Sequence, residues 1–153
     1  MLVFNDDVAA GSAEQPVEIH LATTIEQAGD VSNYNFDVDG KLFQIGDTIY
    51  LRFMEDDNHD GHGVPVTIRI NANGHVKLTR AGENKLQLDF IQGKRVEARY
   101  QTPYGLLPIE TVTPNLDIQY QNQPLSGNVM VDYNLYAQEQ LLGRYQLRLQ
   151  FTV

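Results

Sequence analysis

From Pro16 onward, apolar and polar residues alternate with a period of two along most of the chain. The run from Val17 to Glu26 reads Val-Glu-Ile-His-Leu-Ala-Thr-Thr-Ile-Glu, and the run from Arg144 to Phe151 has the same alternation. This pattern is typical of β-strands with one buried face, whereas a helix needs apolar residues every three to four positions. No segment of useful length has the helical period. The pattern therefore predicts an all-β protein.

Turn residues between the runs predict how neighbouring strands pair, because directly opposed residues must face the same side of a sheet. A three-residue loop at 72–74, for example, gives Gly74 the left-handed position that such loops reserve for glycine. A turn is also expected at Pro114-Asn115. The predicted pairs are Ile70–Val76, Ile68–Leu78, Arg80–Leu86, Leu88–Val96, Asp89–Arg95, Tyr100–Ile109, Arg99–Glu110, Thr113–Leu116, Tyr133–Tyr145 and Val131–Leu147.

These hairpins follow one another without interruption, and a sheet of so many sequential strands must curl. Closure removes the exposed edges of such a sheet. We therefore expect a single antiparallel up-and-down (meander) β-barrel of eight to ten strands, with the last strand near the first. Residues 16–153 contain no linker and are expected to form this one β-barrel domain. Residues 1–15 lack a period and are expected to form a flexible N-terminal arm.

Composition and charge narrow the range of partners. The formal net charge of -9, with no cluster of Lys and Arg, disfavours binding to nucleic acids or to anionic membrane surfaces. The absence of cysteine excludes disulfides, thiol nucleophiles and cysteine-bound zinc. No apolar run approaches the about 20 residues of a membrane-spanning helix. The first residues lack the features of a signal peptide, so a cytoplasmic location is expected.

Several short segments carry a resemblance to a known family. The most specific are Arg80-Ala81-Gly82 and Thr102-Pro103-Tyr104-Gly105, and the others are Thr24-Ile25-Glu26, Ile49-Tyr50-Leu51, Val66-Thr67-Ile68-Arg69-Ile70 and Tyr133-Asn134-Leu135. In this order they resemble the YwiB-like family of uncharacterised bacterial proteins, over about residues 17–153. The resemblance implies a lipocalin-like (calycin-type) β-barrel and no established activity.

Arg80 is the most informative single residue, since the alternation places it on the inward face with Val76 and Leu78. A guanidinium among apolar side chains needs a carboxylate, several carbonyls, an aromatic face or an anionic ligand. It is therefore either a structural arginine that braces one end of the barrel or an anchor for a ligand. The inward hydroxyls include Thr23, Thr111, Thr113 and Tyr145 together with the candidate ligand-binding residues Tyr100, Thr102 and Tyr133. Such hydroxyls fit both a pocket lining and a filled core.

The acidic stretch from Glu55 to Gly63 contains Asp56-x-Asn58-x-Asp60-Gly61, the first half of a calcium-binding loop. The second half is missing, because Thr67 stands where the bidentate Glu is needed. The loop also contains His59 and His62. It is thus a candidate calcium loop whose alternative is a solvated hairpin tip.

No catalytic motif is present, and no cofactor is expected. The paired acids Glu97 and Glu110 alternate to the outer face, where Arg99 neighbours them. The leading interpretation is a binding module that holds a small apolar or mildly anionic ligand in the barrel interior. An alternative is a filled barrel that binds other proteins and forms a homodimer. A third is an enzyme with a site at the barrel mouth.

Overall fold

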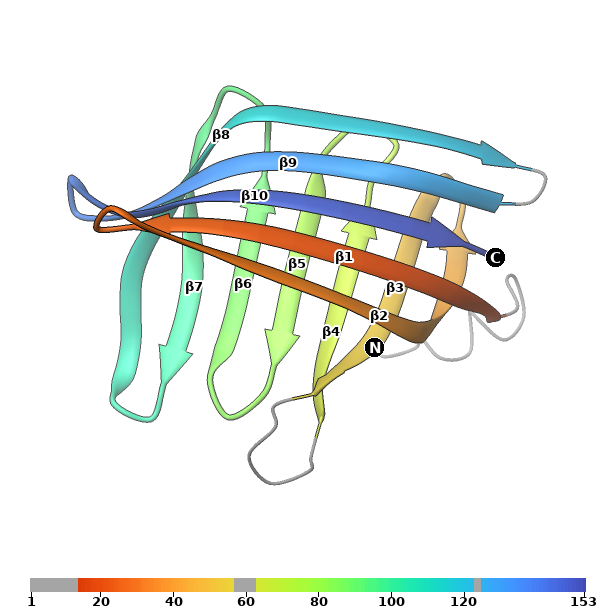
Figure 1. Ribbon diagram of the computed structural model, residues 1–153, viewed down its shortest axis with the longest axis horizontal. Helices are drawn as coiled ribbons and strands as arrows, with labels where there is room; N and C mark the ends of the chain where they lie inside the picture. Colours follow the sequence, from red (N-terminus) through yellow and green to blue (C-terminus); the bar gives the residue numbers. More distant parts are fainter. Residues whose placement is uncertain (1–13, 57–62, 123–124) are drawn as a thin grey trace.

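The computed structural model describes residues 14–56, 63–122 and 125–153, and within these ranges every regular element is a β-strand. The strands are β1 (Gln15–Gln27), β2 (Asp30–Ile45), β3 (Thr48–Asp56), β4 (Gly63–Ile70), β5 (Val76–Ala81), β6 (Lys85–Phe90), β7 (Arg95–Thr102), β8 (Gly105–Asn122), β9 (Leu125–Ala137) and β10 (Gln140–Thr152). They form an antiparallel meander closed by pairing of β1 with β10 (Figure 1). The prediction of one all-β, up-and-down barrel is confirmed.

The barrel has two walls whose strands cross at a steep angle (Figure 1). The long-strand wall consists of β1, β9, β10, residues 30–39 of β2 and residues 115–122 of β8. The short-strand wall consists of β3 to β7, residues 41–45 of β2 and residues 105–112 of β8. Strands β2 and β8 therefore belong to both walls and form the two corners.

Each corner has a local cause in the sequence. In β2 the backbone at Gly40 lies so close to β3 that a Cβ there would be 2.5 Å from the carbonyl oxygen of Arg52. In β8 the register shifts between Val112 and Asn115, on either side of Pro114. Proline is tolerated in a strand where the ladder is interrupted. The turn predicted at Pro114-Asn115 is therefore wrong: β8 bends there and continues to Asn122.

Half of the predicted registers are confirmed. Ile70 pairs with Val76, Ile68 with Leu78, Arg80 with Leu86, Tyr133 with Tyr145 and Val131 with Leu147. Gly74 has a φ of 90°, the left-handed conformation expected for the 72–74 loop.

Two registers are wrong by two residues. Strand β6 pairs with β7 through Leu86–Tyr100 and Gln87–Arg99, which excludes Leu88–Val96 and Asp89–Arg95. Strand β7 turns into β8 at Pro103-Tyr104, so that Thr102 faces Gly105. Tyr100 therefore faces Leu107 instead of Ile109, and Arg99 faces Pro108 instead of Glu110. A shift of two leaves every side chain on its predicted face, so the meander is preserved.

Apolar side chains from all ten strands fill the space between the walls. Phe43, Phe90 and Phe151 are among the largest fully buried side chains. Each such side chain stabilises the fold by about 1.5–3 kcal/mol relative to exposure. Of the predicted flexible arm, residues 1–15, only Glu14 and Gln15 lie within the described ranges. No helix in those ranges is long and apolar enough to cross a membrane.

Candidate functional site

A pocket of about 640 Å³ lies at one end of the barrel, termed here the mouth pocket. The β1–β2 and β9–β10 turns of the long-strand wall lie together at this end (Figure 1). The hairpin strands β5 to β8 contribute the facing side. The lining residues are Gln27, Arg80, Leu86, Tyr100, Leu107, Pro108, Ile109, Leu135, Ala137, Gln138, Leu142 and Tyr145.

The wall of the mouth pocket is mainly apolar, with a few polar groups at its sides. Leu107 and Leu142 are 44% and 40% exposed although both line the pocket. Gln27 donates a hydrogen bond to the Tyr145 hydroxyl at 3.3 Å, and Asn84 donates one to the Tyr100 hydroxyl at 3.4 Å. A mainly apolar pocket with a few polar groups is typical of a small-molecule site.

Arg80 meets Glu55 across the short-strand wall. The guanidinium donates from Nε to Oε2 at 3.0 Å and from Nη2 to Oε1 at 3.1 Å, which is the bidentate geometry of a strong arginine–carboxylate pair. The two side chains are 39% and 33% exposed, so water reaches both. Arg80 is thus inward-facing, as the alternation predicts, but its charge is already matched.

Tyr133 is buried and does not line the mouth pocket. Its ring is stacked on Tyr145 with centroids 4.8 Å apart and contacts Phe90 at 4.6 Å. Burial raises the pKa of the Tyr133 hydroxyl far above its ordinary value of 10.0, and the positive charge of Arg80 opposes part of that rise. Tyr133 is therefore a neutral core residue that supports the pocket through Tyr145.

Thr102 is the last residue of β7, directly before the β7–β8 turn. Its hydroxyl donates to the Gly105 carbonyl at 3.0 Å and accepts from the Tyr104 amide at 3.1 Å. Of the four predicted ligand-binding residues, the structure brings Arg80 and Tyr100 together on the pocket wall. It places Tyr133 in the buried core and Thr102 outside the lining.

Other inward hydroxyls belong to the core. Thr111 and Thr113 are buried, and the Thr111 hydroxyl lies 3.1 Å from the Asp89 carbonyl and 3.2 Å from that of Val96. The Thr111 hydroxyl therefore joins β8 to the backbone of β6 and β7.

Two residues at the site were not identified from the sequence: Glu55, which binds the pocket residue Arg80, and Leu142, which lines the pocket. Glu55 was assigned to the acidic loop, although the alternation Leu51, Phe53, Glu55 places it on the inward face. Leu142 sits where the β10 register shifts between Leu141 and Gly143, and a bulge of this kind interrupts the period that the sequence shows.

In the candidate calcium loop, Asn58, Asp60, His59 and His62 lie outside the described residues. Asp56 is the last residue of β3. Among the residues that the structure describes, no group of three or more His, Cys, Asp or Glu side chains could hold a metal ion.

The outer face carries separate ion pairs. Arg95, and not Arg99, pairs with Glu110, at 2.8 Å, and its guanidinium carbon lies 4.7 Å from the centre of the Tyr136 ring. On the long-strand wall, His20 and Asp37 form a hydrogen bond, and this bond is the main reason that the pKa of His20 is raised from 6.5.

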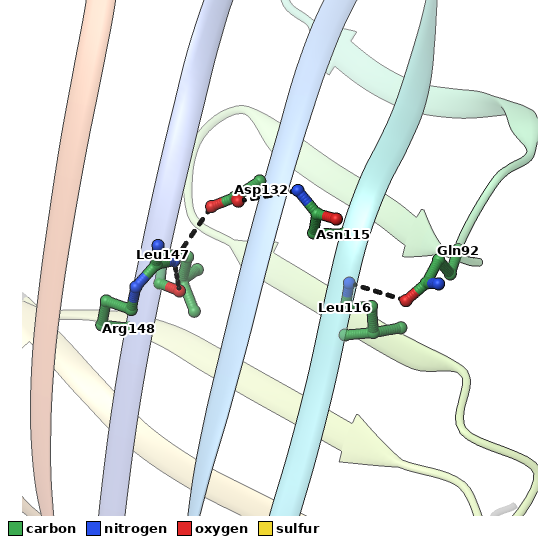
Figure 2. A network of polar contacts seen from close by, with 6 residues as sticks. All are labelled: Gln92, Asn115, Leu116, Asp132, Leu147 and Arg148. Atoms are coloured by element: carbon green, nitrogen blue, oxygen red, sulfur yellow. Dashed lines mark hydrogen bonds and ion pairs between the residues drawn. The ribbon is translucent and has the colours of Figure 1, made fainter.

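A polar network marks the β8 corner (Figure 2). Asp132 accepts from Arg148 at 3.1 Å and from the Asn115 amide at 3.2 Å, and so connects β8, β9 and β10. Beside it, the backbone amide of Leu116 donates to the side-chain oxygen of Gln92 at 3.0 Å.

This geometry defines a class: a closed ten-stranded antiparallel barrel with a packed core and a pocket at one end. Within that class, the chain belongs to the family described as a domain of unknown function (DUF1934), whose model matches residues 19–149. It is 23% identical over 124 residues to the "Uncharacterized beta-barrel protein YwiB" of Bacillus subtilis, covering 81% of this chain and 84% of that protein.

The crystal structure of the ywiB protein from Bacillus subtilis is similar, with a TM-score of 0.79 at 20% identity. The alignment covers 94% of this chain and 96% of that one. At this identity the likeness establishes the shared barrel fold. The family resemblance drawn from the sequence is confirmed.

Proposed function

We propose that the protein is a binding module for a small, mainly apolar molecule that carries a neutral or mildly anionic oxygen. The observation that carries the proposal is the mouth pocket, which is lined by partly exposed leucines and an inward arginine. Its volume of about 640 Å³ falls within the range of ligand sites, about 300–1,000 Å³. A ligand would cover Leu107 and Leu142 and release water from their apolar surface.

The polar groups of the pocket favour an oxygen acceptor at one end of the ligand. Arg80 uses Nε and Nη2 to bind Glu55, so its remaining nitrogen, Nη1, is the one that can turn to a ligand. Because Glu55 neutralises the guanidinium and the whole chain has a net charge of -9, a strongly anionic ligand is disfavoured. The ligand's place is the mouth of the barrel, since the core fills the interior.

The test uses a neutral apolar dye, Nile red, followed by fluorescence. Leu107→Glu places a carboxylate in the mouth pocket, and Leu106→Glu places the same charge on the neighbouring residue, which is 61% exposed and outside the lining. We expect at least about tenfold weaker dye binding in Leu107→Glu, equivalent to 1.4 kcal/mol. Leu106→Glu should bind the dye like the wild type.

Native mass spectrometry of the protein purified from its own host provides a second measurement. A retained small molecule that is lost in Leu107→Glu and kept in Leu106→Glu supports the proposal. Equal dye binding by the two variants, or no dye binding by the wild type, contradicts it.

A further inference from the structure

The outer edge of β8 beyond its corner has no described strand beside it. Residues 115–122 pair with β9 on one side, while no described strand pairs with them on the other. In Figure 1, β8 lies at the margin of the long-strand wall. A free edge of this length presents a row of unpaired amides and carbonyls to another chain.

The direction of these backbone groups follows from one hydrogen bond. Leu116 donates its amide to the Gln92 side chain, so this amide points away from β9 (Figure 2). Along a strand the backbone groups of every second residue point the same way. The amides and carbonyls of Ile118 and Tyr120 therefore also point outward, and those of Asp117 and Gln119 point to β9.

Free edges are usually protected by proline, lysine, a bulge or a covering loop. Gln92 provides such cover for Leu116. After Asp117, the residues Ile-Gln-Tyr-Gln-Asn over 118–122 contain no proline or charge, and Tyr120 is 51% exposed. The protection thus ends where two good strand-forming residues, Ile118 and Tyr120, present their outward backbone groups.

We propose that this edge pairs with the same edge of a second copy of the chain, antiparallel and with the two-fold axis at Gln119. Ile118 then faces Tyr120 of the other copy, and Asp117 faces Gln121. The outward groups of Ile118 and Tyr120 form the hydrogen-bonded pairs, and the two Gln119 residues form a non-hydrogen-bonded pair. The contact is isologous and closes as a dimer.

Charge distinguishes this edge from the other free edge of the long-strand wall. Residues 30–39 of β2 also lack a described partner on one side, but they include Asp30, Asp37 and Asp39. Two such edges would bring six carboxylates together. The β8 edge contributes only Asp117 over residues 115–122, and the proposed register places it opposite an amide. Self-pairing is therefore favoured at β8.

Gln119→Cys gives the sharpest test, because the chain has no cysteine of its own. Cα atoms in a non-hydrogen-bonded antiparallel pair lie about 4.5 Å apart, within the range of a disulfide. Mild oxidation should convert Gln119→Cys mainly to a covalent dimer. The control is Asn128→Cys, which lies directly beside Gln119 on β9 and two strand spacings farther from its counterpart. It should not be cross-linked by the same oxidation.

A second pair of variants tests the backbone contact. Tyr120→Pro removes an outward amide that β9 does not use, whereas Tyr120→Ala keeps it. Light scattering should give twice the 17.3 kDa chain mass for the wild type and Tyr120→Ala, and the chain mass for Tyr120→Pro. Circular dichroism confirms that all three are folded.

A monomeric wild type, or cross-linking that is no greater for Gln119→Cys than for Asn128→Cys, overturns the proposal. If an extended peptide or residues 1–13 cover the edge instead of a second copy, Gln119→Cys remains monomeric. This result also overturns the proposal.

Discussion

Arg80 and Glu55 form a partly exposed ion pair, and this exposure determines how much the pair contributes to the stability of the fold. Removing one partner of a fully buried pair costs about 3–5 kcal/mol, whereas exposed pairs are typically worth about 0–1 kcal/mol. With both side chains about one-third exposed, water can solvate whichever partner is left. The ion pair therefore contributes little to the free energy of unfolding, and its main effect is to fix the position of Arg80 on the pocket wall.

We expect Arg80→Met to fold and to lower the free energy of unfolding by about 1 kcal/mol. Adding Glu55→Gln should remove most of that loss, because the carboxylate no longer lacks its cation. Urea unfolding of the wild type, both single variants and the double variant measures the coupling. A loss of about 3–5 kcal/mol in Arg80→Met would instead mean that Glu55 is left as a buried charge.

At the level of elements, the sequence predicted the strands and their buried faces well, and half of the registers between them. Loops such as 72–74 were assigned correctly because a one-residue error would mix buried and exposed faces. The β6–β7 and β7–β8 registers were wrong by two residues, since a shift of two keeps Tyr100 inward and Arg99 outward. Alternation alone cannot distinguish such registers.

The corners and bulges were beyond the reach of the sequence pattern. Pro114 resembles a turn residue, yet it lies in a strand that bends from one wall to the other. The same limitation applies to the site: Arg80 and Tyr100 were found from alternation, whereas Leu142 lies at a bulge. The packing of the two walls against each other determines these positions, and the residue pattern of a single strand does not reveal that packing.

The β2 corner provides a test of this view. Gly40→Ala places a methyl group 2.5 Å from the Arg52 carbonyl oxygen, and backbone cannot move aside as a flexible side chain can. We expect the free energy of unfolding to fall by about 1–3 kcal/mol. Asp39→Ala, at the neighbouring exposed residue, is the control and should change it by less than about 0.5 kcal/mol. Equal effects in denaturant titrations would show that the corner does not depend on close approach at Gly40.

On the scale of the whole molecule, closure joins the two ends of the chain. Glu18 pairs with Thr152 and Ile19 with Phe151, so the beginning of β1 lies beside the end of β10. The bend of β8 separates the mouth pocket from the edge proposed to form the dimer, residues 115–122. The first half of β8 lines the pocket, and the second half forms the edge.

The adjacency of β1 and β10 predicts that the chain tolerates circular permutation. Joining Val153 to Met1 makes residues 1–13 the linker, and new ends at Gly82-Glu83 lie in the exposed turn between β5 and β6. Every strand pairing of the barrel is retained, so this permutant should give the wild-type circular dichroism spectrum and one cooperative unfolding transition. A matched permutant opened between Gln146 and Leu147 divides β10, which pairs with both β1 and β9. It should unfold at much lower denaturant or fail to fold. If both permutants were equally stable, closure through an intact β10 would not be what holds the barrel together.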